Sequence, residues 1–342
     1  MTDATATPPA TRRGWWWVGL AMIGFLIAAK LPVAQTLLPI HHPALLVLPS
    51  LAACALVGWW RGGSLPMAVV SCVAAAWMVF AAARSGVSNE VLTAGWSALA
   101  GACLGLSLMA SRSPWFLGKG VVAVLSALIV GALLVVVTPS GPTAFDRTMD
   151  AVLAVRGNAD MNNWRVARSQ MTRASATRAD SASLAMFDRV EQSVASLPQV
   201  ARAVLPSVLV LQSLVAMALA WALFHRFSRL RLGNELGRLR DFRFNDHWIW
   251  SVIVGLVLAL LPALSALRPL GVNLLVVFGT LYAMRGAGVV AWFLRPGRSL
   301  LGLIVGVVLL LLLRDGAAIA LGLVGLGDTW ADWRRRIRPA VS

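Results

Sequence analysis

The chain has 342 residues, of which 58% are hydrophobic and only 13% are charged. Soluble domains carry about 25% charged residues, so this composition excludes an ordinary soluble protein and favours a membrane protein. The formal net charge of +16 would suit a nucleic-acid-binding protein, but the arginines lie at the ends of apolar runs, which is typical of loops that orient membrane helices and argues against nucleic acid as a partner.

Apolar runs long enough to cross a bilayer recur along the chain. A membrane helix needs roughly 20 apolar residues, with about 17 to 25 tolerated. A last apolar stretch, 299–327, carries Arg314, Asp315 and Gly316 at its middle and fits either a tight helical hairpin or one interrupted helix. The other runs fall near residues 15–38, 43–60, 65–83, 91–110, 116–137, 203–225, 248–266 and 270–294. The sequence therefore predicts an all-α fold, a polytopic transmembrane helical bundle with about 9–10 membrane segments.

The distribution of positive charge predicts the orientation of these segments. With the N-terminus inside and 299–327 as a hairpin, the inside segments hold 17 cationic residues and the short outside loops hold four. Arginine and lysine in short loops mark the cytoplasmic side. We therefore expect a bacterial inner-membrane protein with both termini in the cytoplasm. A first membrane anchor is favoured over a cleaved signal peptide, because no convincing cleavage site follows the first run.

Two polar intervals divide the chain into an N-terminal bundle (1–137), an extracytoplasmic insertion (138–202) and a C-terminal bundle (203–342). The C-terminal bundle includes a basic cytoplasmic loop, 226–247, and a basic tail. Within the insertion, apolar residues recur at spacings of three and four and predict one apolar helical stripe. They are Leu184, Phe187, Val190, Val194 and Leu197. We expect a small helical cap whose middle, 157–179, is mobile because it is rich in Asn, Ser, Thr, Ala and Arg.

Arg285 is the strongest candidate for a functional residue. It lies about ten residues, or about 15 Å, from Arg295 and thus near the midplane of its predicted span. A cation exposed to lipid there costs at least about 2.5 kcal/mol, so the side chain should face the bundle interior, a water-filled cavity or a partner. Binding an anionic group is one interpretation. Hydrogen bonds to carbonyls of neighbouring helices, or a span that is simply shifted, are the alternatives.

Other polar residues of the same span extend this hypothesis. At 100° per residue, Tyr282 shares a helix face with Arg285, while Asn273 and Thr280 share another. Together the four residues form a candidate ligand-binding pocket. In the basic loop, Arg238, Arg240 and Arg243 are candidates for docking a partner protein. The alternative interpretation of this loop is a topology determinant that lies against anionic lipid.

Catalytic, metal and cofactor sites are not expected. The adjacent His41 and His42 lack the spacing that chelates a metal. The tetrapeptide from Gly325 to Asp328 matches the GxGD motif of intramembrane aspartyl proteases, whose chemistry needs a second aspartate on a facing helix, and none is found. No phosphate-cradling motif appears, so any energy source must lie on another chain. The GxxxG pairs Gly101/Gly105 and Gly302/Gly306 predict close helix packing within this chain or with another subunit.

Two C-terminal stretches carry a family resemblance. The sequence LGNELGRLRDFRFNDHWIW (232–250) leads into a span, and LGDTWADWRRR (326–336) closes the chain. Together with the segment from Asn273 through Tyr282 to Gly286, they resemble the YybS-like family of bacterial membrane proteins, best over 203–338. That family is distantly similar to the S components of energy-coupling-factor transporters, which capture vitamins or metal ions and work with a transmembrane partner and two ATPases. Gly19, Gly24 and Ala28 are a loose counterpart of the small residues through which an S component docks its partner.

Two functions of different classes follow. The first is a non-enzymatic small-molecule binding or transport component, with a polar pocket near Arg285 and an ATP-driven partner. The second is a membrane scaffold or assembly factor that acts through the basic loop and the external helical cap. Both require the lipid bilayer as a partner, and the sequence leaves cargo and oligomeric state open.

Overall fold

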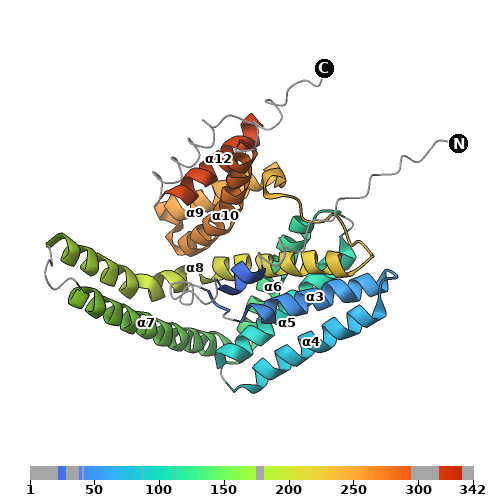
Figure 1. Cartoon of the computed structure of the whole chain (residues 1–342), viewed down its shortest axis with the longest axis horizontal. Coiled ribbons are helices and arrows are strands. Elements are labelled where there is room, and N and C mark those ends of the chain that lie inside the picture. The colour runs from blue at the N-terminus through green and yellow to red at the C-terminus, as the bar shows by residue number, and fades with distance from the viewer. Residues whose placement is uncertain are drawn as a thin grey trace.

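The computed structural model describes residues 22–27, 38–40, 42–86, 88–111, 113–174, 181–293 and 316–332, and every regular element within these ranges is helical (Figure 1). The all-α prediction is therefore confirmed. Six of the described helices are long and apolar enough to cross a membrane, and two shorter apolar helices accompany them. Most of the first predicted span lies outside the described residues, although 22–27 within it are helical, and most of 299–327 and of the basic tail also lie outside them.

The N-terminal bundle contains α3 (Pro43–Trp60), α4 (Leu65–Arg84), α5 (Ser88–Ala110) and α6 (Phe116–Val137). The last part of α8 (Ser181–Phe227), which the sequence assigned to the C-terminal bundle, packs with these helices and is counted with them from here on. Helix α3 packs against α4, α5 and α8, while α6 packs against α5 and α8. Leu104, Leu108, Val124, Met217 and Trp221 lie in the core that these helices share.

Small residues set the spacing between helices of this bundle. A Cβ atom added at Gly101 would lie 2.9 Å from Pro49 Cβ and 3.0 Å from the Pro49 carbonyl oxygen. Only glycine therefore allows α5 to approach α3 this closely. The pair Gly101/Gly105 packs within the chain, whereas Gly302 and Gly306 lie outside the described residues.

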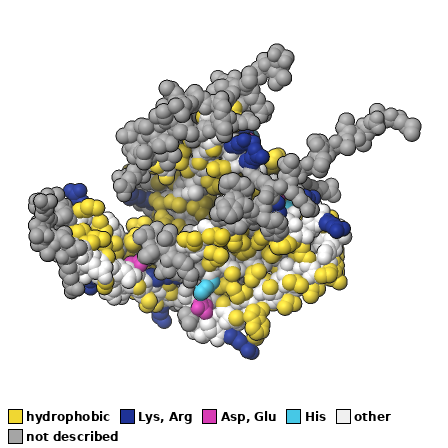
Figure 2. Space-filling model, viewed as in Figure 1, with side chains coloured by type: hydrophobic (Ala, Val, Ile, Leu, Met, Phe, Trp, Pro, Cys, Tyr) yellow, Lys and Arg dark blue, Asp and Glu magenta, His cyan; other side chains and the backbone are white. Residues whose placement is uncertain are grey.

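The outer faces of the bundle are apolar, as a lipid-facing surface requires. On α4, Val70 is 67% exposed and Trp77 is 73% exposed. Figure 2 shows hydrophobic side chains over much of the visible face of the bundle, with arginines toward its edges. This arrangement agrees with a helical bundle that is surrounded by hydrocarbon.

Two long helices project from the bundle. Helix α7 (Gly141–Ala174) packs against the first part of α8, and together they form an arm (residues 141–174 and 181–202) that extends away from the other helices (Figure 1). The predicted insertion is thus helical, but it is one long pair of helices rather than a small cap. Residues 157–174, for which a mobile segment is predicted, lie within α7. Helix α8 continues from the arm into the bundle without interruption through Pro198 and Pro206.

The C-terminal cluster is a separate group formed by α9 (Ile249–Leu260), α10 (Arg268–Phe293) and α12 (Ala317–Ala331) (Figure 1). Helix α10 packs against both neighbours and touches α8. The span predicted at 248–266 is shorter than expected, because α9 ends at Leu260 before Pro262. The 3-10 helix η3 (Pro262–Leu267) then leads into α10.

The basic loop 226–247 joins the bundle to the C-terminal cluster and includes the short helix η1 (Leu239–Asp241). Three hydrogen bonds fix the first half of the loop to the bundle. Asn234 N donates to Pro114 O at 2.8 Å, Trp221 Nε1 donates to Asn234 O at 3.0 Å, and Lys119 Nζ donates to Leu232 O at 3.3 Å. The loop is therefore an ordered connection, and η2 (Asp246–Trp248) overlaps its end and leads directly into α9.

Candidate functional site

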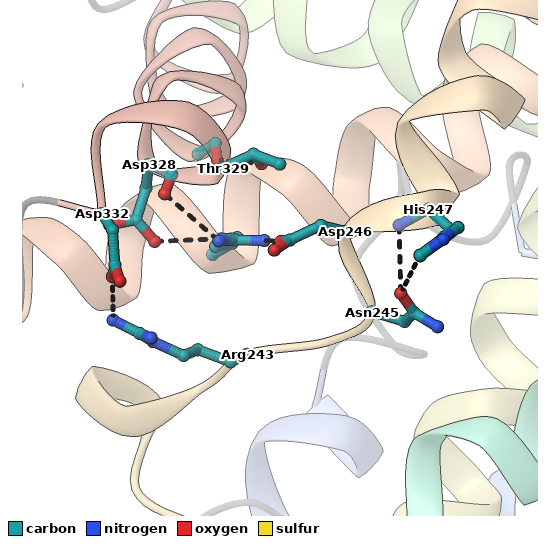
Figure 3. Close-up of polar contacts among 9 residues, drawn as sticks. Arg243, Asn245, Asp246, His247, Asp328, Thr329 and Asp332 are labelled. Atoms are coloured by element: carbon teal, nitrogen blue, oxygen red, sulfur yellow. Dashed lines mark hydrogen bonds and ion pairs between the residues drawn. The ribbon is translucent and has the colours of Figure 1, made fainter.

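Arg285 is buried at the centre of a group of charges in the C-terminal cluster. Its side chain is 4% exposed, and its Nε donates to Asp328 Oδ2 at 3.0 Å while Nη1 donates to Asp246 Oδ1 at 2.6 Å. Nη2 also donates to the Asp328 carbonyl oxygen at 3.3 Å. The two carboxylates approach the guanidinium from opposite sides (Figure 3). We refer to Arg285, Asp246 and Asp328 as the charge triad.

The three members of the triad come from three elements. Arg285 lies on α10, Asp328 lies near the end of α12, and Asp246 begins η2. The side chain of Asp328 is completely buried, whereas that of Asp246 is 59% exposed. The triad therefore lies where the basic loop enters the cluster, and Arg285 has two acidic partners there.

Glycines bring α12 close enough to α10 for the Arg285–Asp328 contact. A Cβ atom added at Gly286 would overlap the carbonyl oxygen of Leu321, and one at Gly325 would overlap that of Tyr282. The helices thus meet backbone to backbone, one turn from the ion pair. In the GxGD tetrapeptide, Gly325 serves this close approach and Asp328 binds Arg285.

Aromatic side chains of the loop cover the triad. The Phe244 ring lies 5.6 Å from Arg285 Cζ and meets the Tyr282 ring edge-on at 4.9 Å between centroids. Trp248 lies beside Phe244, with 5.4 Å between the ring centroids. A second ion pair, between Arg243 and Asp332 at 2.7 Å, ties the loop to the residue that follows α12 (Figure 3). The loop is held to the cluster by both charge and aromatic contacts.

This arrangement constrains the chemistry of the two aspartates. An aspartyl protease needs two carboxyl groups that share a proton, one as acid and one as base. Here the guanidinium separates the two carboxylates, and each binds a different nitrogen. The geometry is that of an ion-pair network, in which one guanidinium bridges two carboxylates.

The predicted pocket residues divide between different places. Tyr282 is fully buried beside Arg285, and its hydroxyl lies near Thr329 but forms no hydrogen bond of normal geometry with any described residue. Asn273 accepts from Ser207 N and donates to Ala203 O, each at 2.9 Å, and so joins α10 to α8. Thr280 is exposed and donates to Val276 O within its own helix. Only Arg285 and Tyr282 are brought together.

The arginines predicted to dock a partner are also in different states. Arg243 binds Asp332, and Arg240 Nε lies 3.6 Å from Asp241 Oδ2. Arg238 is exposed, with no ion pair to any residue that the structure describes. Two of the three side chains are thus engaged within the chain.

Sequence reasoning missed Asp246 and Asp328 as partners of Arg285. They are 39 and 43 residues away in sequence, and no local pattern links them to it. The available signal was energetic, since a buried arginine requires an acid nearby. Both aspartates lie at the boundary of an apolar segment, where such an acid could reach it.

A second polar group lies at the base of the arm, outside the membrane-spanning helices. Arg156 donates to Leu38 O at 3.1 Å and to Pro39 O at 3.4 Å, and burial lowers its pKa to about 10. One turn further along α7, burial raises the pKa of Asp160, and its Oδ2 has no hydrogen-bond partner in the described part of the chain. The arm is therefore seated on the bundle through partly buried charges.

Comparison with known proteins gives a family for the chain. Neither a curated protein nor a solved structure matches it. Residues 19–329 match the profile of a family described as predicted membrane proteins, DUF2232, and this match covers the two helical groups, the arm and the charge triad. The chain therefore belongs to the DUF2232 family of predicted membrane proteins.

Proposed function

We propose that the chain is a non-enzymatic membrane scaffold or assembly factor that holds a partner protein against the arm. The observation that carries this proposal is the arm itself, a stiff pair of helices that extends beyond the bundle (Figure 1). At 1.5 Å per residue, the 34 residues of α7 span about 51 Å. A structure of this length serves contact with something outside the bundle.

Ion pairs stiffen the arm at both ends. Arg168 binds Asp188 at 2.9 Å and also Glu191, which ties α7 to α8 toward the far end. Near the base, Arg202 binds Asp146 at 3.2 Å and also Asp150. Exposed pairs contribute little singly, but several that join the same two helices restrict their relative motion.

The surface of the arm combines exposed apolar and cationic side chains. Val155 is 70% exposed, Val166 is 56% exposed and Met186 is 64% exposed. Because α7 is too rich in charge to lie in hydrocarbon, lipid does not cover these side chains. Arg165 and Arg189 lie on the same arm, exposed and without ion pairs to described residues. A protein surface with acidic groups beside apolar ones fits this combination.

Photo-crosslinking in cells tests the proposal. A photoreactive amino acid at Val155 or Met186 should give the same discrete protein adduct, whereas one at Val70 on the lipid-facing side of α4 should give none. The double variant Asp188→Ala/Glu191→Ala, which releases Arg168, should weaken the adduct. The purified partner should then bind the native chain and bind the Arg165→Glu/Arg189→Glu variant less tightly. Adducts with lipid alone, or equal adducts from Val70, would contradict the proposal.

A small-molecule binding or transport role is the second candidate, in line with the resemblance to YybS-like proteins and S components. It is supported by the buried Tyr282 hydroxyl beside the triad, which has no hydrogen-bond partner among the residues that the structure describes. It is also supported by the exposure of Asp246, which an anionic ligand could displace from Arg285. The engagement of Arg285 by two carboxylates counts against it. Mass spectrometry of the purified protein should find a bound small molecule that Arg285→Ala removes, and a ligand-free protein would count against this role.

A further inference from the structure

One end of the N-terminal bundle gathers cations that form no ion pair within the described ranges of the chain. Arg226 lies in the last turn of α8 and Arg229 follows the helix, and neither forms an ion pair with a described residue. Nearby, Glu235 pairs with Arg231. The pKa of Glu235 is raised by partial burial, but the hydrogen bond and charge of Arg231 and the charge of Arg226 outweigh this and lower it. The acid is thus already committed, and Arg226 and Arg229 leave an excess positive charge here.

Several helix ends meet at this place. Arg61, which follows α3, donates from Nη2 to Leu108 O on α5 at 2.7 Å. Leu230, next to Arg229, lies close to Gly63 in the turn that follows α3. A Cβ atom added at Gly63 would lie 3.4 Å from Leu230 Cδ2. The hydrogen bond from Asn234 N to Pro114 O places the start of α6 next to the same loop. Arg226 and Arg229 therefore lie at the level where α3 and α5 end and α6 begins.

Large aromatic side chains occupy the same level. Trp60, at the end of α3, is 75% exposed, and Trp115, immediately before α6, is 67% exposed. Exposed tryptophans at the ends of membrane helices lie among lipid headgroups, with the ring toward the acyl chains and the N–H toward water. Trp60 and Trp115 thus mark the interfacial layer at the depth of the two arginines.

We propose that this end of the N-terminal bundle binds the headgroup of an anionic phospholipid. Arg226 and Arg229 contact the phosphate, and Trp60 and Trp115 lie at the level of the glycerol and ester groups. The guanidinium fork matches a phosphate oxygen pair, and the uncompensated charge favours a lipid with a net negative charge over a zwitterionic one. The loop backbone is fixed by its bonds to the bundle, so the arginines are held in position before the lipid binds.

Native mass spectrometry of the full chain in neutral detergent tests this site. Titration should show tighter binding of dioleoyl phosphatidylglycerol than of dioleoyl phosphatidylcholine, which has the same acyl chains. Arg226→Gln/Arg229→Gln should weaken phosphatidylglycerol binding on the order of tenfold or more and leave phosphatidylcholine unchanged. The matched control is Arg165→Gln/Arg189→Gln, which removes two exposed, unpaired arginines from the arm and should leave binding of both lipids unchanged. The single variant Arg229→Gln, at an exposed position, provides a second test if the double variant folds poorly.

Specific outcomes would overturn the proposal. Equal affinity for the two lipids, or equal losses in the two double variants, would mean that only diffuse charge attracts the lipid. Displacement of phosphatidylglycerol by soluble glycerol 3-phosphate would assign the site to a free phosphate compound. Displacement by polyglutamate would assign it to an acidic protein segment.

Discussion

The N-terminal bundle and the C-terminal cluster hold their helices together in different ways. The bundle relies on many apolar and small side chains, and its buried cation, Lys119, reaches a loop carbonyl and lies 5.5 Å from the Trp221 ring. The cluster relies on close glycine contacts and on Arg285 between two carboxylates. In lipid, apolar surfaces gain little by meeting each other, so close packing and polar contacts must supply the attraction.

This difference indicates how single substitutions should affect the stability of the bundle and of the cluster. Stability of the bundle is spread over many contacts, so a single substitution removes a small share of it. Stability of the cluster is concentrated in a few directional contacts, and removing one partner leaves a buried charge behind. Single substitutions should therefore damage the cluster more than the bundle.

The largest effect is expected from Asp328→Ala. This change leaves Arg285 buried without its innermost carboxylate and should cost about 3–5 kcal/mol. The loss of stability can be measured by heating the purified protein and monitoring the disappearance of the monodisperse peak in size-exclusion chromatography. Asp246→Ala should cost less, because Asp246 is largely exposed and water can replace it.

A rescue experiment separates charge from packing at the same site. The double variant Arg285→Met/Asp328→Leu removes both charges and keeps apolar volume, so it should recover most of the loss. If the double variant is as unstable as Asp328→Ala, the ion pair is not the cause. The cluster would then differ from the bundle only in its packing.

Gly286→Ala should have the next largest effect. Its Cβ would overlap the Leu321 carbonyl oxygen and force α10 and α12 apart, at a cost of about 1–3 kcal/mol. Gly279→Ala is the matched control on the same helix, because a Cβ there meets nothing within 4 Å. Equal melting temperatures for the two variants would contradict the backbone-to-backbone contact.

Lys119→Met tests the bundle in the same way and should change stability by less than about 1 kcal/mol. The side chain is buried, but the ammonium donates one hydrogen bond and has no carboxylate that its loss would leave unpaired. Methionine keeps the volume and the contact with Trp221. A loss comparable to that of Asp328→Ala would show that the bundle also depends on a single charge.

The sequence predicts the membrane helices better than it predicts the charge triad, because the signals that define a helix lie in neighbouring residues. Helix α6 matches the predicted 116–137, because polar residues bound its apolar run on both sides. Helix α9 ends early because Pro262 closes it, a signal that hydropathy alone does not weigh. Hydropathy is a property of neighbouring residues, so the helices follow from it wherever the ends are marked.

The triad depends on tertiary contacts that a single sequence does not specify. The cost of burying Arg285 predicts an interior position, and its side chain is indeed buried. Its partners come from two other elements, and the glycines that bring α12 near α10 have no sequence signal that names their partner helix. The four predicted pocket residues do not lie together for the same reason. The Asn273 side chain binds α8, and the Thr280 hydroxyl donates to a carbonyl of its own helix.

The smallest effect is expected for charged groups outside the membrane helices, whose contribution to stability depends on pH. Burial raises the pKa of Asp160 above the usual value for an aspartate, so the ionised form costs stability at neutral pH. As pH falls through the raised pKa toward the unfolded value near 3.8, protonation relieves this cost. Glu235 has the opposite sign, because its lowered pKa makes a contribution present above about 4.5 that is lost as pH falls further. Asp160→Asn should therefore raise the melting temperature slightly at pH 7 and progressively less toward pH 4, as followed by tryptophan fluorescence. A gain in melting temperature that is the same at every pH would mean that packing at Asp160, and not its ionisation, limits the stability of the contact between the arm and the bundle.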